Sequence, residues 1–191
     1  MGGLSTTATV IIIIFAVIIL LIFYGIGVYN KLVNSRNKVK DQWAQIDVQL
    51  KRRADLIPNL INTVKGYMAH EQKIIDSITE ARTNLVNAKT VSEQAKANDD
   101  LTKALNSLNV IVENYPDLKS NTNFIQLQDE LAGTENRIAT SRKDYNDAVK
   151  DYNSTIKSFP KNIIAGMFGF TEKDYFEISN TDKEVPNVSF D

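Results

Sequence analysis

The sequence predicts an all-α protein in which one N-terminal transmembrane helix is followed by an antiparallel up-and-down four-helix bundle with long helices. An uncharged apolar run near the N-terminus, heptad spacing of apolar residues beyond it, and the lack of strand-type alternation lead to this prediction. We divide the 191 residues into a short extracytoplasmic N-terminus with the transmembrane helix (1–30), the bundle (31–160) and a C-terminal tail (161–191).

The apolar run begins at Val10, ends at Val28 and contains no charged residue. A helix of about 20 apolar residues spans the hydrocarbon core of a bilayer, so we expect this run to contact membrane lipid along its length. A cleaved signal peptide is the alternative. The nine residues before the run contain no Lys or Arg, and no small-x-small cleavage site follows it, so we favour a retained membrane helix.

The charges around the run predict its orientation. Basic residues follow the run and none precedes it, and the positive-inside rule places such a flank in the cytoplasm. We therefore expect a single-pass protein of the cell membrane, with its N-terminus outside and its bundle in the cytoplasm. The basic residues are Lys31, Arg36, Lys38 and Lys40.

Two apolar stripes predict the first half of the bundle. The first covers residues 32–50, and the second begins at Ile57 and ends near Leu85. Pro58 is tolerated in a first helical turn, where its missing N–H has no partner to lose, and Asp55 is a suitable N-cap. We therefore favour a turn before Pro58. One continuous helix, kinked near Pro58, is the alternative.

Two further stripes predict the second half. A shorter helix is expected from about Ser92, its predicted cap, to Tyr115, with a break over residues 114–121. The last helix has the most regular pattern, because its apolar residues fall seven apart, as expected of a bundle seam. These residues are Phe124, Leu131, Ile138, Tyr145, Tyr152 and Phe159.

The segment that follows Pro160, residues 163–170, is apolar and contains two glycines. In an up-and-down bundle the fourth helix returns towards the membrane, so this segment reaches the bilayer surface or the end of the bundle. Acidic residues follow it, and anionic lipid would repel them. We therefore expect Met167, Phe168 and Phe170 to fold back onto the bundle, with contact to the bilayer as the alternative.

Composition excludes several classes of function. Lys and Arg number 22 and Asp and Glu 23, so no basic field would attract nucleic acid, and we expect no nucleic-acid partner. The sequence has no cysteine, which excludes disulfides, thiol catalysis, Cys-ligated metals and a lipidated cysteine.

His70-Glu71 is the one pair that suggests chemistry. A zinc-protease helix needs a second histidine four residues after the first, and that position is Ile74. A phospho-accepting histidine on a membrane-anchored bundle is a remote alternative, although the sequence has no Gly-rich ATP-binding module. We therefore predict no catalytic residue, no metal and no cofactor.

Several polar residues occupy or border the predicted seams. Glu71 lies at heptad spacing between Val64 and Ile78, and a buried carboxylate needs a partner, so we expect an internal Glu–Arg pair that fixes helix register. The tyrosines are expected in the core with their hydroxyls near the surface. The arginines on or beside seams are Arg36, Arg53 and Arg137, and the tyrosines are Tyr145 and Tyr152.

A set of short motifs resembles a known family. They are Tyr29-Asn30, Leu32-Val33, Trp43 with the block at residues 46–53, residues 55–60, Gly66-Tyr67 with His70-Glu71, residues 113–118, residues 135–138, Tyr145-Asn146 and Phe159-Pro160. Together they are similar to the LemA family of bacterial and archaeal membrane proteins, from the membrane helix to about Phe170. The resemblance implies one N-terminal membrane helix, a cytoplasmic four-helix bundle and no catalytic residues.

These observations favour a non-enzymatic scaffold or adaptor that presents its bundle to an unidentified protein partner, and they leave an oligomer open. A regulatory subunit of a membrane enzyme, such as a protease, is the alternative. Phosphorelay through His70 is the remote one.

Overall fold

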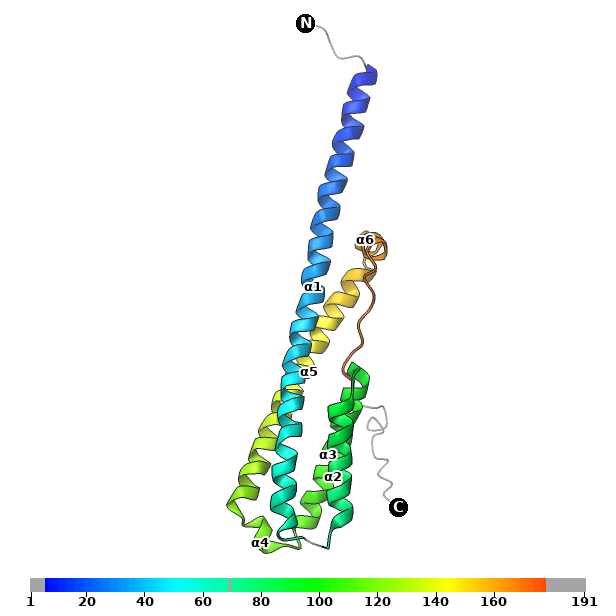
Figure 1. Cartoon of the computed structure of the whole chain (residues 1–191). Helices are drawn as coiled ribbons and strands as arrows, with labels where there is room; N and C mark the ends of the chain where they lie inside the picture. The colour runs from blue at the N-terminus through cyan, green and yellow to red at the C-terminus, as the bar shows by residue number, and fades with distance from the viewer. Residues whose placement is uncertain (1–5, 69, 178–191) are drawn as a thin grey trace, which may run out of the picture. The chain divides into compact units, whose positions relative to one another are not determined.

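The structure, a computed structural model, describes residues 6–68 and 70–177. Within this part of the chain all regular structure is helical, as the sequence predicted (Figure 1). The helices are α1 (Thr6–Lys65), α2 (Gln72–Asn87), α3 (Val91–Val112), α4 (Pro116–Lys119), α5 (Thr122–Lys157) and α6 (Lys161–Met167).

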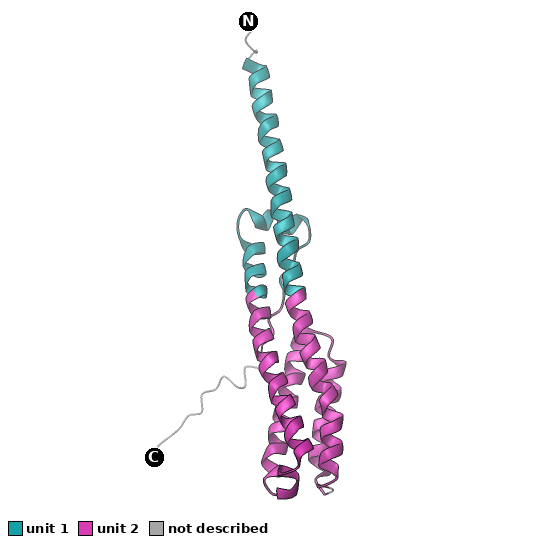
Figure 2. Ribbon diagram, turned by 90° about the vertical axis from the view of Figure 1, so that its left-hand side faces the viewer, with its two compact units in different colours: residues 1–40, 148–173 teal, residues 41–147, 174–191 magenta. Residues whose placement is uncertain are grey.

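The chain forms two compact units, coloured separately in Figure 2. One contains residues 1–40 and 148–173, and we call it the N/C unit. The other contains residues 41–147 and 174–191, and we call it the bundle unit. Helices α1 and α5 contribute to both.

The bundle unit is the predicted up-and-down four-helix bundle. Its four long helices are the C-terminal part of α1, then α2, α3 and the N-terminal part of α5, and α4 lies in the connection before α5. The apolar stripes face inward, which gives the bundle a closely packed core. Its fully buried side chains include Ile46, Ile57, Leu60, Ile78, Leu101, Leu108 and Leu118.

The predicted turn before Pro58 is wrong, because α1 continues through Pro58 to Lys65. A proline has no N–H, so the carbonyl of Ala54 loses its usual helical partner. The side chain of Arg82 on α2 donates its Nε–H to that carbonyl at 2.8 Å. Asp55 lies inside the helix and caps nothing, and the chain turns after Lys65 instead.

The predicted cap of the third helix is also wrong by two residues. Thr90, not Ser92, caps α3: its hydroxyl accepts from the Glu93 backbone N–H at 3.2 Å, and the Glu93 carboxylate accepts from the Thr90 N–H at 3.0 Å. This is a capping box, which satisfies two backbone donors at once. The expected break before the last helix contains the short α4.

In the N/C unit, α1 carries the apolar run. Among the described residues α1 is the one helix long and apolar enough to cross a membrane, with a mean hydropathy of 3.2 over its most apolar window and none of that window buried. It is therefore a candidate membrane span. Further along this unit, Leu32 and Val39 of α1 and Val149 and Tyr152 of α5 are buried.

Of the three side chains that were expected to fold back onto the bundle, the structure buries one, and it does so within the N/C unit. Phe170 is buried, whereas Met167 and Phe168 are exposed. The segment begins as a further helix, α6, whose one buried residue is Ala165.

Candidate functional site

A buried arginine joins three helices of the bundle unit. Arg53 on α1 is 3% exposed, donates to the side chains of Asn98 at 2.6 Å and Thr102 at 3.0 Å on α3, and pairs with Glu135 on α5. Burial lowers the pKa of Arg53, and the negative charge and hydrogen bond of Glu135 oppose that shift. Because a guanidinium stays protonated in proteins, the network holds a buried positive charge that is paired with Glu135.

The predicted internal Glu–Arg pair therefore exists, but Glu71 is not its carboxylate. Glu71 is the N-cap residue of α2 and is half-buried, and it accepts a hydrogen bond from the Tyr115 hydroxyl at 3.1 Å. This hydrogen bond raises the pKa of Tyr115. The neighbouring His70 is exposed.

The other two arginines have different surroundings. Arg36, in the N/C unit, places its guanidinium 5.1 Å from the centre of the Phe170 ring, a cation–π contact. Arg137 is exposed on α5 of the bundle unit. Neither contributes to the Arg53 network.

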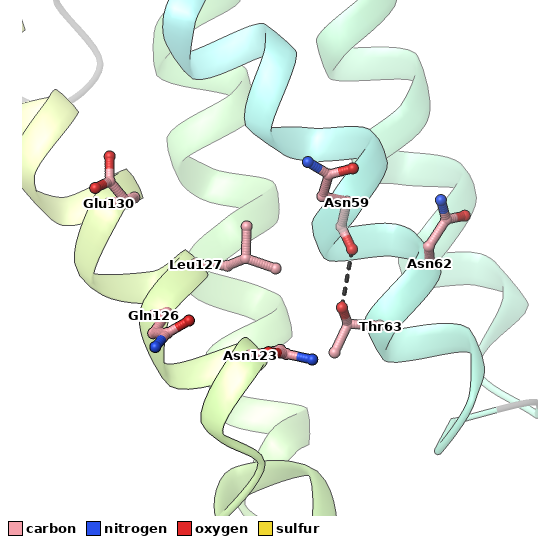
Figure 3. Close-up of a pocket in the computed structure, with 7 residues that line it drawn as sticks. All are labelled: Asn59, Asn62, Thr63, Asn123, Gln126, Leu127 and Glu130. Carbon is pink, nitrogen blue, oxygen red and sulfur yellow. Dashed lines mark hydrogen bonds between the residues drawn. The ribbon is translucent and has the colours of Figure 1, made fainter.

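A groove on the bundle unit brings together amide side chains from α1 and α5 (Figure 3). We call it the amide groove. The hydroxyl of Thr63 donates to the Asn59 carbonyl of its own helix at 3.0 Å, and Leu127 supplies an apolar patch. The remaining lining residues are Asn59, Asn62, Asn123, Gln126 and Glu130.

The carboxamides of this groove are available for binding. Within the described part of the chain, the side-chain amides of Asn59, Asn62, Asn123 and Gln126 make no hydrogen bond to protein, and all four residues are exposed. Each carboxamide offers an acceptor oxygen and two N–H donors, so together they can pair with a polypeptide backbone, which presents both kinds of group.

The chain itself shows this recognition on α5. In the bundle unit, Asn146 donates to the carbonyl of Phe176 at 3.1 Å and accepts from its N–H at 2.9 Å, while the Tyr145 hydroxyl donates to the carbonyl of Asp174 at 2.8 Å. The ring of Trp43 packs against two aromatic rings, with its centre 5.4 Å from that of Tyr145 and 6.1 Å from that of Phe176.

The N/C unit repeats the pattern one heptad later. Asn153 donates to and accepts from the backbone of Lys173, both at 2.9 Å, and the Tyr152 hydroxyl donates to the carbonyl of Thr171 at 2.9 Å. Each Tyr-Asn pair of α5 thus binds three backbone groups of a non-helical segment. Burial is the main cause that raises the pKa of both tyrosines, and that of Tyr145 reaches about 12.

The sequence predicted some of these residues and missed others. Tyr145 and Tyr152 were expected in the core and are buried there. Asn146 was named only as part of a family motif and Asn153 was not named, although the repeat of Tyr145-Asn146 and Tyr152-Asn153 at heptad spacing was a usable signal. The amide groove had no such signal, because exposed Asn and Gln are common on helix surfaces.

Comparisons with known proteins agree with the family resemblance that the motifs indicated. The LemA family model matches residues 42–190. Magnetosome proteins MamQ 1 and MamQ 2 of Paramagnetospirillum magneticum are each 26% identical over 175 residues, covering 78% of this chain and 64% of the relative. The alignment therefore spans less than two thirds of those relatives' length.

Protein LemA of Metamycoplasma hominis is 27% identical over 164 residues, covering 84% of this chain and 74% of that protein. The family match includes α2, α3 and α5 entirely, together with the part of α1 that enters the bundle unit. The chain belongs to the LemA family.

Proposed function

We propose that the protein is a non-enzymatic membrane adaptor, whose bundle binds an extended segment of a partner protein in the amide groove. The observation that carries this proposal is the set of carboxamides from α1 and α5 that line the amide groove and make no hydrogen bond to protein within the described part of the chain. The contacts of Asn146 and Asn153 with backbone in the same chain support it, because they use the same side-chain chemistry on the same kind of helix surface.

In this proposal residues 10–28 of α1 cross the membrane, the N-terminus lies outside and the bundle lies in the cytoplasm. The uncharged, exposed face of α1 and the basic residues that follow it support this arrangement. A groove lined mostly by amides, with Glu130 as its one charged lining residue, suits a transient partner, because it offers hydrogen bonds without a large apolar area.

Site-specific photocrosslinking in cells tests the adaptor function. A photoreactive residue at Asn62 or Gln126, in the groove, should give a discrete higher-mass product with a partner protein. The same residue at Val110, which is exposed on α3, is the control and should not give that product. The double substitution Asn59→Leu and Asn123→Leu should reduce the product from Gln126 several-fold, because it removes two of the carboxamides. Equal products from all three positions would refute the groove as the binding site.

Two further probes separate the alternatives. If a photoreactive residue at Leu20 in the apolar run captures an integral enzyme, the regulatory-subunit function replaces the adaptor. If wild type carries phosphohistidine and His70→Ala does not, the phosphorelay replaces it.

A further inference from the structure

Apolar side chains of the N/C unit are exposed around α6. Phe159, Met167 and Phe168 are 80%, 73% and 58% exposed, and Ile163 is exposed as well. Four large apolar side chains within ten residues form a patch that a water-soluble surface rarely carries. The patch therefore indicates an apolar surrounding for this segment.

Helix α6 contacts the end of the apolar run of α1. The ring of Phe168 lies 4.8 Å from that of Tyr29, and the side chain of Ile164 lies within 4 Å of the space that a Cβ at Gly25 would occupy. Gly25 is part of the uncharged run at residues 10–28. In a membrane-inserted α1, α6 therefore lies at the depth of the last turns of the span.

An apolar groove runs between these two helices. It is lined by residues of α1 between Ile18 and Tyr29 and by Ile164, Met167 and Phe168. No charged side chain lines it, and the Tyr29 hydroxyl is its one polar side-chain group. Lys31 follows the lining residues of α1, and Lys161 precedes those of α6. Basic residues commonly occupy such positions at the edge of the hydrocarbon core.

We propose that α6 with Phe168 is submerged in the cytoplasmic leaflet and that the α1–α6 groove binds a phospholipid acyl chain. This inference rests on the proposed membrane insertion of α1. The occupant is an acyl chain because the residues of α1 that line the groove, apart from Tyr29, belong to the lipid-facing run, where acyl chains are the surrounding medium. Because the groove opens onto the acyl chains of the bilayer, one of these chains fills it.

The acidic residues after α6 do not oppose this placement. Glu172, the nearest of them, pairs with Lys157 at 2.8 Å, which offsets its charge. The buried Phe170 lies against Tyr29 and the Arg36 guanidinium, so the chain leaves α6 along a surface of the N/C unit. The repulsion expected from anionic lipid is thereby reduced at the first acidic position.

Spin labels in the full-length protein test the depth of α6. The chain has no cysteine, so Phe168→Cys, Leu20→Cys and Val110→Cys each give one labelled site in vesicles of phosphatidylcholine and phosphatidylglycerol. The label at position 168 should match that at position 20, with high accessibility to oxygen and several-fold lower accessibility to an aqueous nickel complex than at position 110. If the label at position 168 is as accessible to the nickel complex as the label at position 110, while the label at position 20 stays protected, the inference fails and the membrane anchor stands. If the labels at positions 168 and 20 are both as accessible as the label at position 110, the anchor and the inference fail together.

A phosphatidylcholine with a diazirine on its acyl chain tests the groove. Illumination should attach the lipid to peptides that contain α6, and Ile22→Trp should reduce this several-fold, because the larger ring fills the groove. Leu20→Trp is the matched control, since Leu20 is exposed on the same helix but does not line the groove. Equal attachment in Ile22→Trp and wild type would overturn the acyl-chain site. So would a label at position 168 that is shielded from both oxygen and nickel, which would identify a protein in the groove.

Discussion

At the scale of single residues, the Tyr-Asn pairs of α5 explain how a helix holds a segment with no regular structure. A heptad rises about 10.5 Å along a helix, and three residues of extended chain cover about 10 Å. The pairs are seven residues apart, and their partners, Thr171 with Lys173 and Asp174 with Phe176, are three apart. The spacing of the Tyr-Asn pairs along α5 therefore matches the spacing of their partners along the segment.

We expect Asn153→Ala to release the segment locally. The substitution leaves the N–H and carbonyl of Lys173 without their partner, which costs about 1–3 kcal/mol for a buried group. Hydrogen exchange at the Lys173 amide should become faster. Asn136→Ala is the matched control, because Asn136 is exposed on the same helix and its loss should leave that amide unchanged.

The raised pKa of Tyr145 predicts that the folded protein loses stability at alkaline pH. Its pKa is raised from 10.0 to about 12 in the folded protein, chiefly by burial. The unfolded chain therefore releases this proton first, and stability falls as the pH rises from 10 towards 12. Tyr145→Phe lacks this titration. The difference in unfolding free energy between wild type and variant, measured with denaturant in detergent micelles, should narrow between pH 9 and pH 11.5. A constant difference would contradict the raised pKa.

At the scale of elements, the sequence predicted helices well and their connections less well. Heptad spacing reports which face of a helix is buried, and it placed residues such as Ile138 and Tyr152 correctly. Its last predicted seam residue, Phe159, is wrong, because α5 ends at Lys157 and Phe159 is 80% exposed. Pro58 was misread because its compensation comes from Arg82, a residue on another helix. No local pattern at Pro58 could reveal a donor that only the folded bundle brings near.

This compensation can be measured with a double-mutant cycle. Arg82→Ala leaves the Ala54 carbonyl without a donor and should destabilise the bundle by about 1–3 kcal/mol. In a Pro58→Ala background the new N–H at position 58 can pair with that carbonyl. The same Arg82→Ala change should then cost roughly 1 kcal/mol less. Additive effects in thermal or denaturant unfolding would show that Arg82 does not replace the missing hydrogen bond.

The seam of α5 gives the strongest destabilisation. Leu131 and Ile138 are 4% and 2% exposed, so Leu131→Asp and Ile138→Asp each bury a carboxylate with no partner. We expect a loss of roughly 3 kcal/mol or more, seen as a lower thermal midpoint. Ala132→Asp and Ala139→Asp introduce the same residue at exposed neighbouring positions and should have little effect. Similar midpoints for all four variants would contradict the assigned face.

At the scale of the whole molecule, the net charge is −1, so acidic and basic residues nearly balance. The charges that flank the apolar run do not balance, because basic residues follow the run and none precedes it. The family match and the helical bundle followed from motifs and periodicity. The amide groove and the α1–α6 groove did not, because each is formed by residues more than fifty positions apart in sequence. Sequence patterns of period 3.5 describe single helices, and grooves arise only where two helices meet.

The flanking charges lead to the last prediction, an N-out and C-in orientation. Lys31, Lys38 and Lys40 follow the span, and residues 1–9 carry no charged side chain, so the basic flank should stay in the cytoplasm. A C-terminal green fluorescent protein should fluoresce, and a C-terminal alkaline phosphatase should be inactive. Replacing these three lysines with glutamine while placing lysines at positions 2, 3 and 5 should shift part of the population to the opposite orientation. An active phosphatase on the wild-type chain would refute the orientation, and a variant that keeps the wild-type reporter pattern would show that these charges do not determine it.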